Sequence, residues 1–456
     1  MIVSFNPSTG AELGRYPLDR PEDVERKLQR AAQAQQAWRM RSVQERCVLL
    51  AEVARVLRRN REQYAAMITA EMGKPLAEAE AEIEKSAWTC DFYADAAPGF
   101  LADVRVPSNA ADSRVVFDPL GVVLAVMPWN YPFWQFIRFA APALAAGNAA
   151  LLKHANNVPQ CALALADVFR EAGAVEGLVS TLMIDASEVA GVLADARVAA
   201  VTLTGSTAVG KLVAAQAGSL MKKQVLELGG SDPFIVLADA DVEAAANMAV
   251  KARFSNTGQS CISAKRFIVE DAVADRFVAA FCAATRKLRV GDPTDRSTTV
   301  GPLARSNLRS DLHSQVERSV SAGAVVALGG HPVEGPGFFY APTILDRVTP
   351  DMAAAVEETF GPVAAVIRVG SADEAIAMAN ATEFGLGAAL WTGDLERAHS
   401  LARRIEAGAV FVNGLVASDP RLPFGGVKQS GYGRELGEFG IREFTNIKTV
   451  WVGPAH

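Results

Sequence analysis

Three residues that lie far apart in the chain have the types needed to attack a carbonyl carbon. Cys261 follows a run of small polar residues in "FSNTGQSCISAKRF" (254–267), whereas a cysteine that only packs usually has apolar neighbours. Glu227 stands in "LELGG", and Asn130 lies between two prolines in "PWNYP". A thiol nucleophile, a carboxylate that accepts a proton and an amide that donates to an oxyanion form one chemical set.

Each of these residues also has a purely structural explanation. Cys261 could be an inert core thiol, Glu227 could pair with a basic residue, and Asn130 could only shape a turn. The other cysteines lie in helical contexts and are interpreted as structural: Cys47, Cys90, Cys161 and Cys282. The combination of the three residues favours catalysis, with Cys261 acting as a thiolate.

A glycine pair follows the apolar run "VAAVTLTG" and offers a second functional signal. Gly205 and Gly210 flank "STAV", but the middle glycine of a GxGxxG fingerprint is absent. The pair is either an ordinary strand-to-helix junction or a place where free N–H groups meet a dinucleotide phosphate. A dinucleotide would supply a hydride acceptor, which a hydrolase does not need.

The elements that position these residues can be read from the pattern of apolar runs. From 121 to about 240, short apolar runs alternate with alanine-rich helical stretches, and a second such series begins near 260. This alternation is typical of parallel sheets with crossover helices. The first hundred residues have helical spacing, and 103–121 contains two extended pieces around a polar turn, which predicts a hairpin.

We therefore predict an α/β protein with two doubly wound α/β domains and a β-strand oligomerisation arm. Residues 1–102 and 119–228 are assigned to a dinucleotide-binding domain, and 229–430 to a catalytic domain. Residues 103–118 and 431–456 form the arm and C-terminal strand, and that strand pairs with the hairpin or with another subunit. Because an isolated two-stranded arm is barely stable in water, we expect a homodimer or homotetramer.

Ligands of open α/β sheets bind at the carboxyl ends of the strands. We expect the loops with Asn130, Gly205, Glu227 and Cys261 each to follow a strand and to meet at such an edge.

The bulk composition excludes several classes of partner. With 45 basic against 51 acidic residues, the net charge of −6 gives no basic surface for nucleic acid. Five irregularly spaced cysteines without a Cys/His cluster predict no metal site and a reducing compartment. The N-terminus lacks signal-peptide features, and the most apolar run, 121–152, is broken by three prolines and Arg138. We expect a cytoplasmic protein with a small-molecule partner and no membrane association.

Six motifs, in order, resemble those of the aldehyde dehydrogenase superfamily over essentially the whole chain: "PWNYP", "LTGSTAVG", "LELGGSDP", "GQSC", "EETFGPV" and "LPFGGVKQSGYGRE". The resemblance implies that Cys261 attacks an aldehyde to form a thiohemiacetal, with Asn130 and the Cys261 N–H holding the oxyanion. Hydride then passes to a nicotinamide, and Glu227 activates water to hydrolyse the thioester.

The resemblance also implies a set of cofactor-binding residues. Glu358 would hold the nicotinamide ribose, although it could instead cap a helix end, and Phe360 would lie beside the ring. Lys153 would reach the adenosine ribose, and Ser206 would bind a phosphate. The whole set is Trp129, Lys153, Asn156, Gly205, Ser206, Glu358 and Phe360.

The lysine motif "KHANNVP" departs from the common family pattern, in which a carboxylate occupies the position of Asn156. A carboxylate there would repel the 2′-phosphate of NADP. Neutral Asn156 beside Lys153 predicts that NADP is accepted and preferred, with NAD as the alternative cofactor. An asparagine that only caps the turn would leave the cofactor undecided.

The segments "MPWNYPFWQ", "SCISAKRF" and "ASDPRLPFGG" resemble one subgroup of the family, the NADP-type succinate-semialdehyde dehydrogenases. A helix starting after Pro132 would place Trp134 and Arg138 on one face. Arg138 could grip a distal substrate carboxylate with Ser418 as hydroxyl partner, while Trp134 walls the channel. Alternatively, Arg138 pairs with a carboxylate of this chain or of a neighbouring subunit.

The sequence therefore predicts NAD(P)-dependent oxidation of an aldehyde, with succinic semialdehyde giving succinate as the leading reaction. Two alternatives stay open. The same chemistry could act on glutarate semialdehyde or a medium-chain aldehyde, or the scaffold could be non-catalytic. Transfer to coenzyme A is disfavoured because Glu227, the candidate hydrolytic base, is present.

Overall fold

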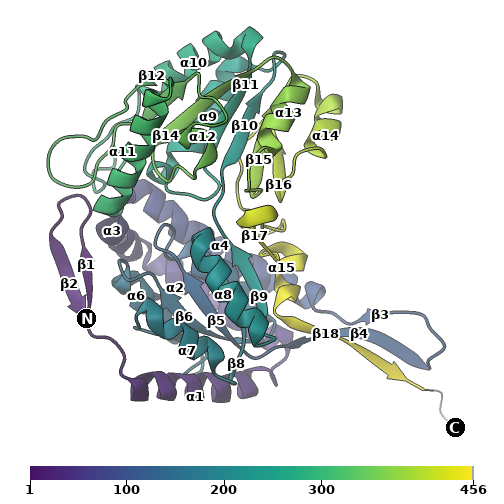
Figure 1. Ribbon diagram of the computed structural model, residues 1–456. Helices are drawn as coiled ribbons and strands as arrows, with labels where there is room; N and C mark the ends of the chain where they lie inside the picture. Colours follow the sequence, from purple (N-terminus) through teal and green to yellow (C-terminus); the bar gives the residue numbers. More distant parts are fainter. Residues whose placement is uncertain (454–456) are drawn as a thin grey trace.

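The structure is a computed structural model that describes residues 1–453. Two large sheets dominate it, one above the other in Figure 1. Each sheet contains a single antiparallel pairing at one edge, and its other pairings are parallel. The predicted α/β class is confirmed.

The first sheet has six strands in the order β17 (Gly431–Tyr432), β9 (Lys223–Glu227), β8 (Val198–Thr204), β5 (Val122–Met127), β6 (Ala149–His154) and β7 (Val179–Thr181). Its connecting helices are α5 (Trp134–Ala145), α6 (Pro159–Glu171), η1 (Ala186–Glu188), α7 (Val189–Ala194) and α8 (Thr207–Ser219). β6 is buried along its whole length and β5 nearly so, because helices cover both faces of a parallel sheet.

The N-terminal region packs helices beside this sheet: α1 (Pro21–Trp38), α2 (Val43–Arg59), α3 (Arg61–Met72) and α4 (Leu76–Phe100). Leu50, Val53 and Leu57 of α2 are fully buried, which is the predicted helical spacing. Gly73 ends α3 with φ +80°, a left-handed conformation that suits glycine. β1 (Ile2–Phe5) and β2 (Glu12–Tyr16) form a separate antiparallel pair.

The second sheet has seven strands in the order β12 (Val325–Leu328), β13 (Thr343–Asp346), β14 (Val363–Val369), β11 (Ala264–Glu270), β10 (Asp232–Val236), β15 (Gly387–Trp391) and β16 (Ala409–Val412). Its helices are α9 (Val242–Phe254), α10 (Asp271–Thr285), α11 (Ser306–Ser321), α12 (Ala353–Val356), α13 (Ala372–Asn380) and α14 (Leu395–Ala402). β10 belongs to this sheet, although its apolar run falls in the first predicted series. The chain therefore changes sheets between β9 and β10, next to Glu227.

A narrow three-stranded arm projects from the body (Figure 1). It contains β3 (Val104–Arg105), β4 (Asp112–Pro119) and β18 (Thr445–Val452), and β18 pairs with β4 from Thr445↔Pro119 to Val452↔Asp112. The predicted hairpin and its pairing with the C-terminal strand of the same chain are confirmed. β17 and α15 (Gly437–Glu443), which fall in the predicted segment 431–456, lie on the body instead. The last residues of that segment, 454–456, lie outside the described residues.

Among residues 1–453, no helix is both long and apolar enough to cross a membrane.

Candidate active site

Three of the four predicted loops lie at the carboxyl ends of the first sheet. Asn130 follows β5, Gly205 follows β8 directly, and Glu227 is the last residue of β9. The prediction that the Cys261 loop also follows a strand is wrong. That loop follows α9 and η2 (Ser255–Gly258) and leads into β11, because the apolar run "AKRFIVE" begins only after the cysteine. Cys261 therefore approaches the site from the amino end of a second-sheet strand.

The backbone before Cys261 is strained. Asn256 and Thr257 adopt left-handed φ values of 53° and 56°, which are costly for residues with a Cβ, and Gly258 follows at 72°. Asn256 N donates to Glu78 Oε2 at 2.7 Å, and Asn256 Nδ2 donates to the Asn130 carbonyl at 2.8 Å. These bonds hold the turn and tie the cysteine loop to the Asn130 loop.

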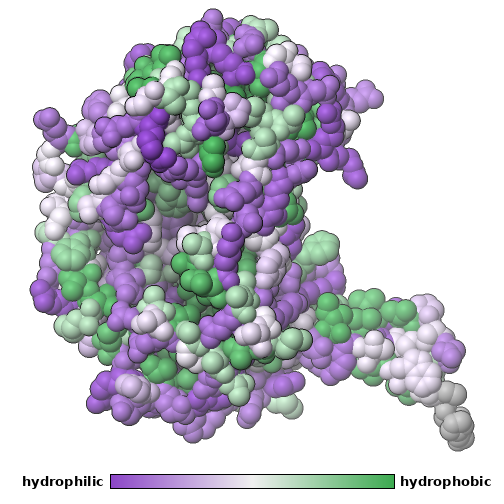
Figure 2. Space-filling model, viewed as in Figure 1, coloured by the Kyte–Doolittle hydropathy of each residue, from purple (hydrophilic) through white to green (hydrophobic). Residues whose placement is uncertain are grey.

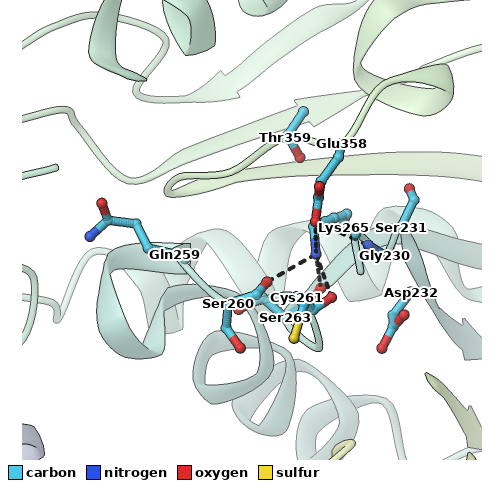
Figure 3. A network of polar contacts seen from close by, with 12 residues as sticks. Gly230, Ser231, Asp232, Gln259, Ser260, Cys261, Ser263, Lys265, Glu358 and Thr359 are labelled. Atoms are coloured by element: carbon cyan, nitrogen blue, oxygen red, sulfur yellow. Dashed lines mark hydrogen bonds and ion pairs between the residues drawn. The ribbon is translucent and has the colours of Figure 1, made fainter. Parts of the chain in front are cut away.

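Lys265, a residue that the sequence analysis missed, anchors the cysteine loop from the other side. Its Nζ donates to the carbonyls of Ser260, Cys261 and Ser263 at 3.0, 2.8 and 3.1 Å, and lies 3.8 Å from Glu358 Oε1 (Figure 3). Burial lowers the pKa of Lys265, whereas the Glu358 charge opposes that shift. A lysine followed by an arginine at the start of an otherwise largely apolar strand was the available signal.

Cys261 lies where two cavities of about 250 Å³ each meet, and only Gln135 also lines both. The first cavity is lined by most of the predicted cofactor and catalytic residues: Trp129, Asn130, Gly205, Ser206, Glu227, Glu358 and Phe360. The second is lined by the three predicted substrate residues: Trp134, Arg138 and Ser418. A thiol at this junction can contact a molecule in either cavity.

Asn130 and Glu227 have free hydrogen-bonding capacity in the first cavity. Asn130 Nδ2 donates to the Gln259 carbonyl at 3.0 Å, and its Oδ1 accepts from Gln135 Nε2 at 3.0 Å. One hydrogen of the Asn130 amide is left over. Both carboxyl oxygens of Glu227 are buried and have no hydrogen-bond partner within residues 1–453. Glu227 is thus able to accept a proton from a reactant.

The electrostatics of the site favour a neutral thiol before ligands bind. Burial raises the pKa of Cys261 to about 12, and the charges of Arg138 and Lys265 offset this only in part. Desolvation therefore opposes the resting thiolate that the sequence analysis predicts. Burial, with the nearby Glu435 carboxylate, raises the pKa of Glu227 well above its ordinary value. Desolvation therefore favours the protonated form of Glu227, so this carboxyl must ionise before it can accept a proton.

Glu358 and two aromatic rings form one wall of the first cavity. Glu358 Oε1 accepts from Gly230 N at 3.0 Å, and a Cβ at Gly229 would lie 2.6 Å from Glu358 Oε2. The two glycines after Glu227 therefore allow this close approach. The rings of Phe360 and Trp129 meet edge to face at 5.8 Å. A carboxylate beside aromatic faces fits a nicotinamide riboside.

Ser206 caps α8 by accepting a hydrogen bond from Val209 N at 3.4 Å. The helix therefore begins at the wall of the first cavity, where its N-terminal dipole favours an anion such as a phosphate.

Lys153 and Asn156 lie together but outside the lining of the first cavity. Lys153 Nζ donates to Asn156 Oδ1 at 2.8 Å, and burial lowers the pKa of Lys153 to about 8. Asn156 Nδ2 donates to Asp185 Oδ1 at 3.3 Å. Asp185 is an exposed carboxylate that the sequence analysis missed, and its hydrogen bond places it beside Asn156.

Arg138 forms a buried ion pair with Glu435, and its Nη2 lies 3.4 Å from Thr204 Oγ1. This ion pair agrees with the alternative interpretation from the sequence, in which Arg138 pairs with a carboxylate of its own chain. Helix α5 begins at Trp134, as predicted, and places Trp134 and Arg138 at the second cavity.

Lys85 of α4 also reaches the second cavity, a position that the sequence analysis missed. Its Nζ donates to Ser418 Oγ at 2.7 Å and lies 4.3 Å from the centre of a Trp134 ring. Its place in an ordinary helical pattern gave no signal.

Comparison with known proteins identifies the family. The family model described as "Aldehyde dehydrogenase family" matches residues 1–450. The chain belongs to this family. It is 50% identical over 456 residues to succinate-semialdehyde dehydrogenase (NADP(+)) 1 of Mycobacterium tuberculosis (strain H37Rv), covering 99% of each chain. It is 48% identical over 449 residues to succinate semialdehyde dehydrogenase (NAD(P)+) of Escherichia coli K12, covering 98% of this chain and 97% of the other.

A solved aldehyde dehydrogenase structure has the same fold. Succinic semialdehyde dehydrogenase of Streptococcus pyogenes, solved with NADP+, superposes with a TM-score of 0.97 at 37% identity over 100% of both chains. The resemblance stated from the six motifs is confirmed for the family and for the fold.

Proposed function

We propose that this aldehyde dehydrogenase oxidises succinic semialdehyde to succinate with NADP as the hydride acceptor. The observation that carries the proposal is the position of Cys261 between two cavities. One cavity is lined by predicted cofactor-binding residues, and the other is lined in part by cationic side chains. The relatives named above, which share about half of their residues with this chain, support the substrate and the cofactor.

The side chains of the first cavity supply the chemistry. Cys261 Sγ adds to the aldehyde carbon while its proton passes to Glu227, and the new oxyanion accepts from Asn130 Nδ2 and Cys261 N. When bound, NADP accepts the hydride that leaves the thiohemiacetal carbon. Glu227 releases the thiol proton to solvent and then removes a proton from water, which attacks the Cys261 thioester; that proton returns to the departing Cys261 sulfur as the carboxylic acid is released.

Residues next to both sheets hold the cofactor in this proposal. Glu358 binds the nicotinamide ribose, Phe360 and Trp129 flank the ring, and Gly205 and Ser206 lie at the pyrophosphate. Lys153 and neutral Asn156 accept the 2′-phosphate, while exposed Asp185 weakens the preference for it by like-charge repulsion. We therefore expect NADP to be preferred and NAD to be used more slowly.

We further propose that the arm joins subunits into a homodimer or a dimer of dimers. β18 leaves one edge of the arm sheet unpaired within residues 1–453, and apolar residues gather on the part of the arm next to the body (Figure 2). Ile447 and Trp451 are 60% and 53% exposed. An exposed apolar strand edge is readily covered by another chain.

Initial rates with a panel of aldehydes test the function directly. We expect kcat/KM for succinic semialdehyde with NADP to exceed that for butanal by at least about tenfold, since only the former carries a carboxylate. Higher kcat/KM for a neutral medium-chain aldehyde would refute the substrate assignment. Turnover at least about tenfold better with NAD than with NADP would refute the cofactor assignment.

A further inference from the structure

The side-chain nitrogen of Lys265 is enclosed by three carbonyl oxygens of the cysteine loop. It donates to the carbonyls of Ser260, Cys261 and Ser263, and the lysine side chain is 0% exposed (Figure 3). A carbonyl oxygen only accepts hydrogen bonds, so each of the three needs its own N–H donor. An ammonium has three N–H donors, whereas a neutral amine has one fewer. The arrangement therefore requires a positively charged Lys265.

The charge of Lys265 is balanced without a tight ion pair. Glu358 Oε1 lies 3.8 Å from Lys265 Nζ and accepts from Gly230 N. Burial lowers the pKa of Lys265 and the Arg253 charge adds to this shift, whereas the charges of Glu358 and Asp232 oppose it. All N–H groups of this buried cation therefore go to the loop carbonyls, which makes these hydrogen bonds charge-assisted.

One of the three carbonyls belongs to the peptide group that carries the Cys261 N–H. In that peptide, the Ser260 carbonyl accepts from Lys265 at 3.0 Å. The Cys261 N–H has no hydrogen-bond acceptor within residues 1–453, and it is the proposed donor to the oxyanion. Hydrogen bonds in a chain polarise one another, so a cation on the carbonyl of a peptide makes its N–H a stronger donor. A single peptide group thus links Lys265 to the oxyanion.

We infer that Lys265 is a positioning residue of the oxyanion site, whose ammonium polarises the Ser260–Cys261 peptide and strengthens the hydrogen bond from Cys261 N to the oxyanion. This inference rests on the proposed function, in which Asn130 Nδ2 is the other oxyanion donor. The amide oxygen of Asn130 accepts from the neutral side chain of Gln135, so that donor receives no comparable polarisation. Lys265 therefore makes the Cys261 N–H the stronger of the two donors.

The charge of Lys265 also favours the Cys261 thiolate, and two reagents separate this effect from the oxyanion. Iodoacetamide alkylates the sulfur with loss of iodide, and no oxyanion forms. 4-Nitrophenyl acetate transfers its acetyl group to the same sulfur with loss of 4-nitrophenolate, through a tetrahedral oxyanion. Both rate constants scale with the thiolate fraction of Cys261, so this fraction cancels in the acetylation-to-alkylation ratio of the two.

We expect the acetylation-to-alkylation ratio of the full-length, ligand-free protein to fall at least about tenfold in Lys265→Met, since loss of a whole oxyanion donor costs about a hundredfold or more. Lys265→Arg should keep the wild-type ratio, because the guanidinium stays charged and offers N–H donors to the same carbonyls. Asn130→Ala, which lacks the other donor, is the positive control, and Cys261→Ser should yield neither product. If circular dichroism shows that Lys265→Met is unfolded, Lys265→Gln takes its place, because glutamine keeps N–H donors without the charge.

The outcomes separate this inference from the proposed function. If the uncharged variant slows acetylation and alkylation equally, Lys265 only anchors the loop or favours the thiolate, and the inference is wrong. Unchanged rates of both reactions, or a ratio that falls as far in Lys265→Arg as in the uncharged variant, would also refute it. If Asn130→Ala keeps the wild-type ratio, or if wild-type Cys261 reacts with neither reagent, the proposed function fails and the role of Lys265 fails with it.

Discussion

At the scale of single residues, the reactivity of Cys261 is set by the protein atoms packed around its sulfur, although the residue is only partly buried. Two cations lie near the thiol, yet burial dominates and keeps the proton on it at neutral pH. The proton must therefore leave as the substrate binds, and Glu227 is the buried carboxylate with both oxygens free to receive it. The remaining cysteines are buried and, unlike Cys261, line neither of the two cavities: Cys47, Cys90, Cys161 and Cys282.

Alkylation of the ligand-free protein by iodoacetamide tests this ionisation. Because the pKa of Cys261 is raised to about 12, its thiolate fraction should grow about tenfold per pH unit from pH 7 to 10 without a plateau. The rate constant should follow, with one equivalent of label that disappears in Cys261→Ser. A plateau by pH 8 would show that the nearby cations outweigh burial.

At the scale of elements, the site is assembled from two sheets that meet end to end. The strand ends of the first sheet carry Asn130, Gly205 and Glu227, while a strand start of the second carries Cys261 and Lys265. The Gly229–Gly230 link lets the two sheets approach, since side chains there would collide with Glu358 and with the Cys261 carbonyl. The arm contributes no residue to either cavity.

The arm is expected to hold subunits together, which can be tested separately from catalysis. Replacing Ile447 and Trp451 by aspartate should lower the molar mass measured by light scattering, because charges on an apolar contact surface oppose its burial. Met40→Asp, at a position that is 82% exposed on the body, is the matched control and should keep the wild-type mass. An unchanged mass in the arm variant, or a monomeric wild type, would exclude this role of the arm.

At the scale of the whole molecule, the sequence predicted those features that depend on the order of residues within short segments. The alternation of apolar runs and helices predicted the α/β class, and the polar turn near 109 predicted the hairpin. The motifs predicted one site for Asn130, Glu227 and Cys261, because an amide, a carboxylate and a thiol have complementary roles in attack on a carbonyl carbon.

What the sequence could not predict depends on contacts between distant segments. The Arg138–Glu435 pair joins residues about 300 positions apart, and Lys85 meets Ser418 over a similar separation. Neither pair has a periodic signal. The raised pKa of Cys261 likewise follows from burial by both sheets, which no local motif encodes.

The mass of the Glu227→Gln variant after incubation with succinic semialdehyde and NADP tests the central claim most directly. Without a base to activate water, the Cys261 thioester should accumulate and add about 100 Da, and the adduct should be absent in Cys261→Ala/Glu227→Gln. Its formation should require NADP, because the thiohemiacetal alone dissociates. An adduct on another cysteine, or continued acid production by the double variant, would contradict the account.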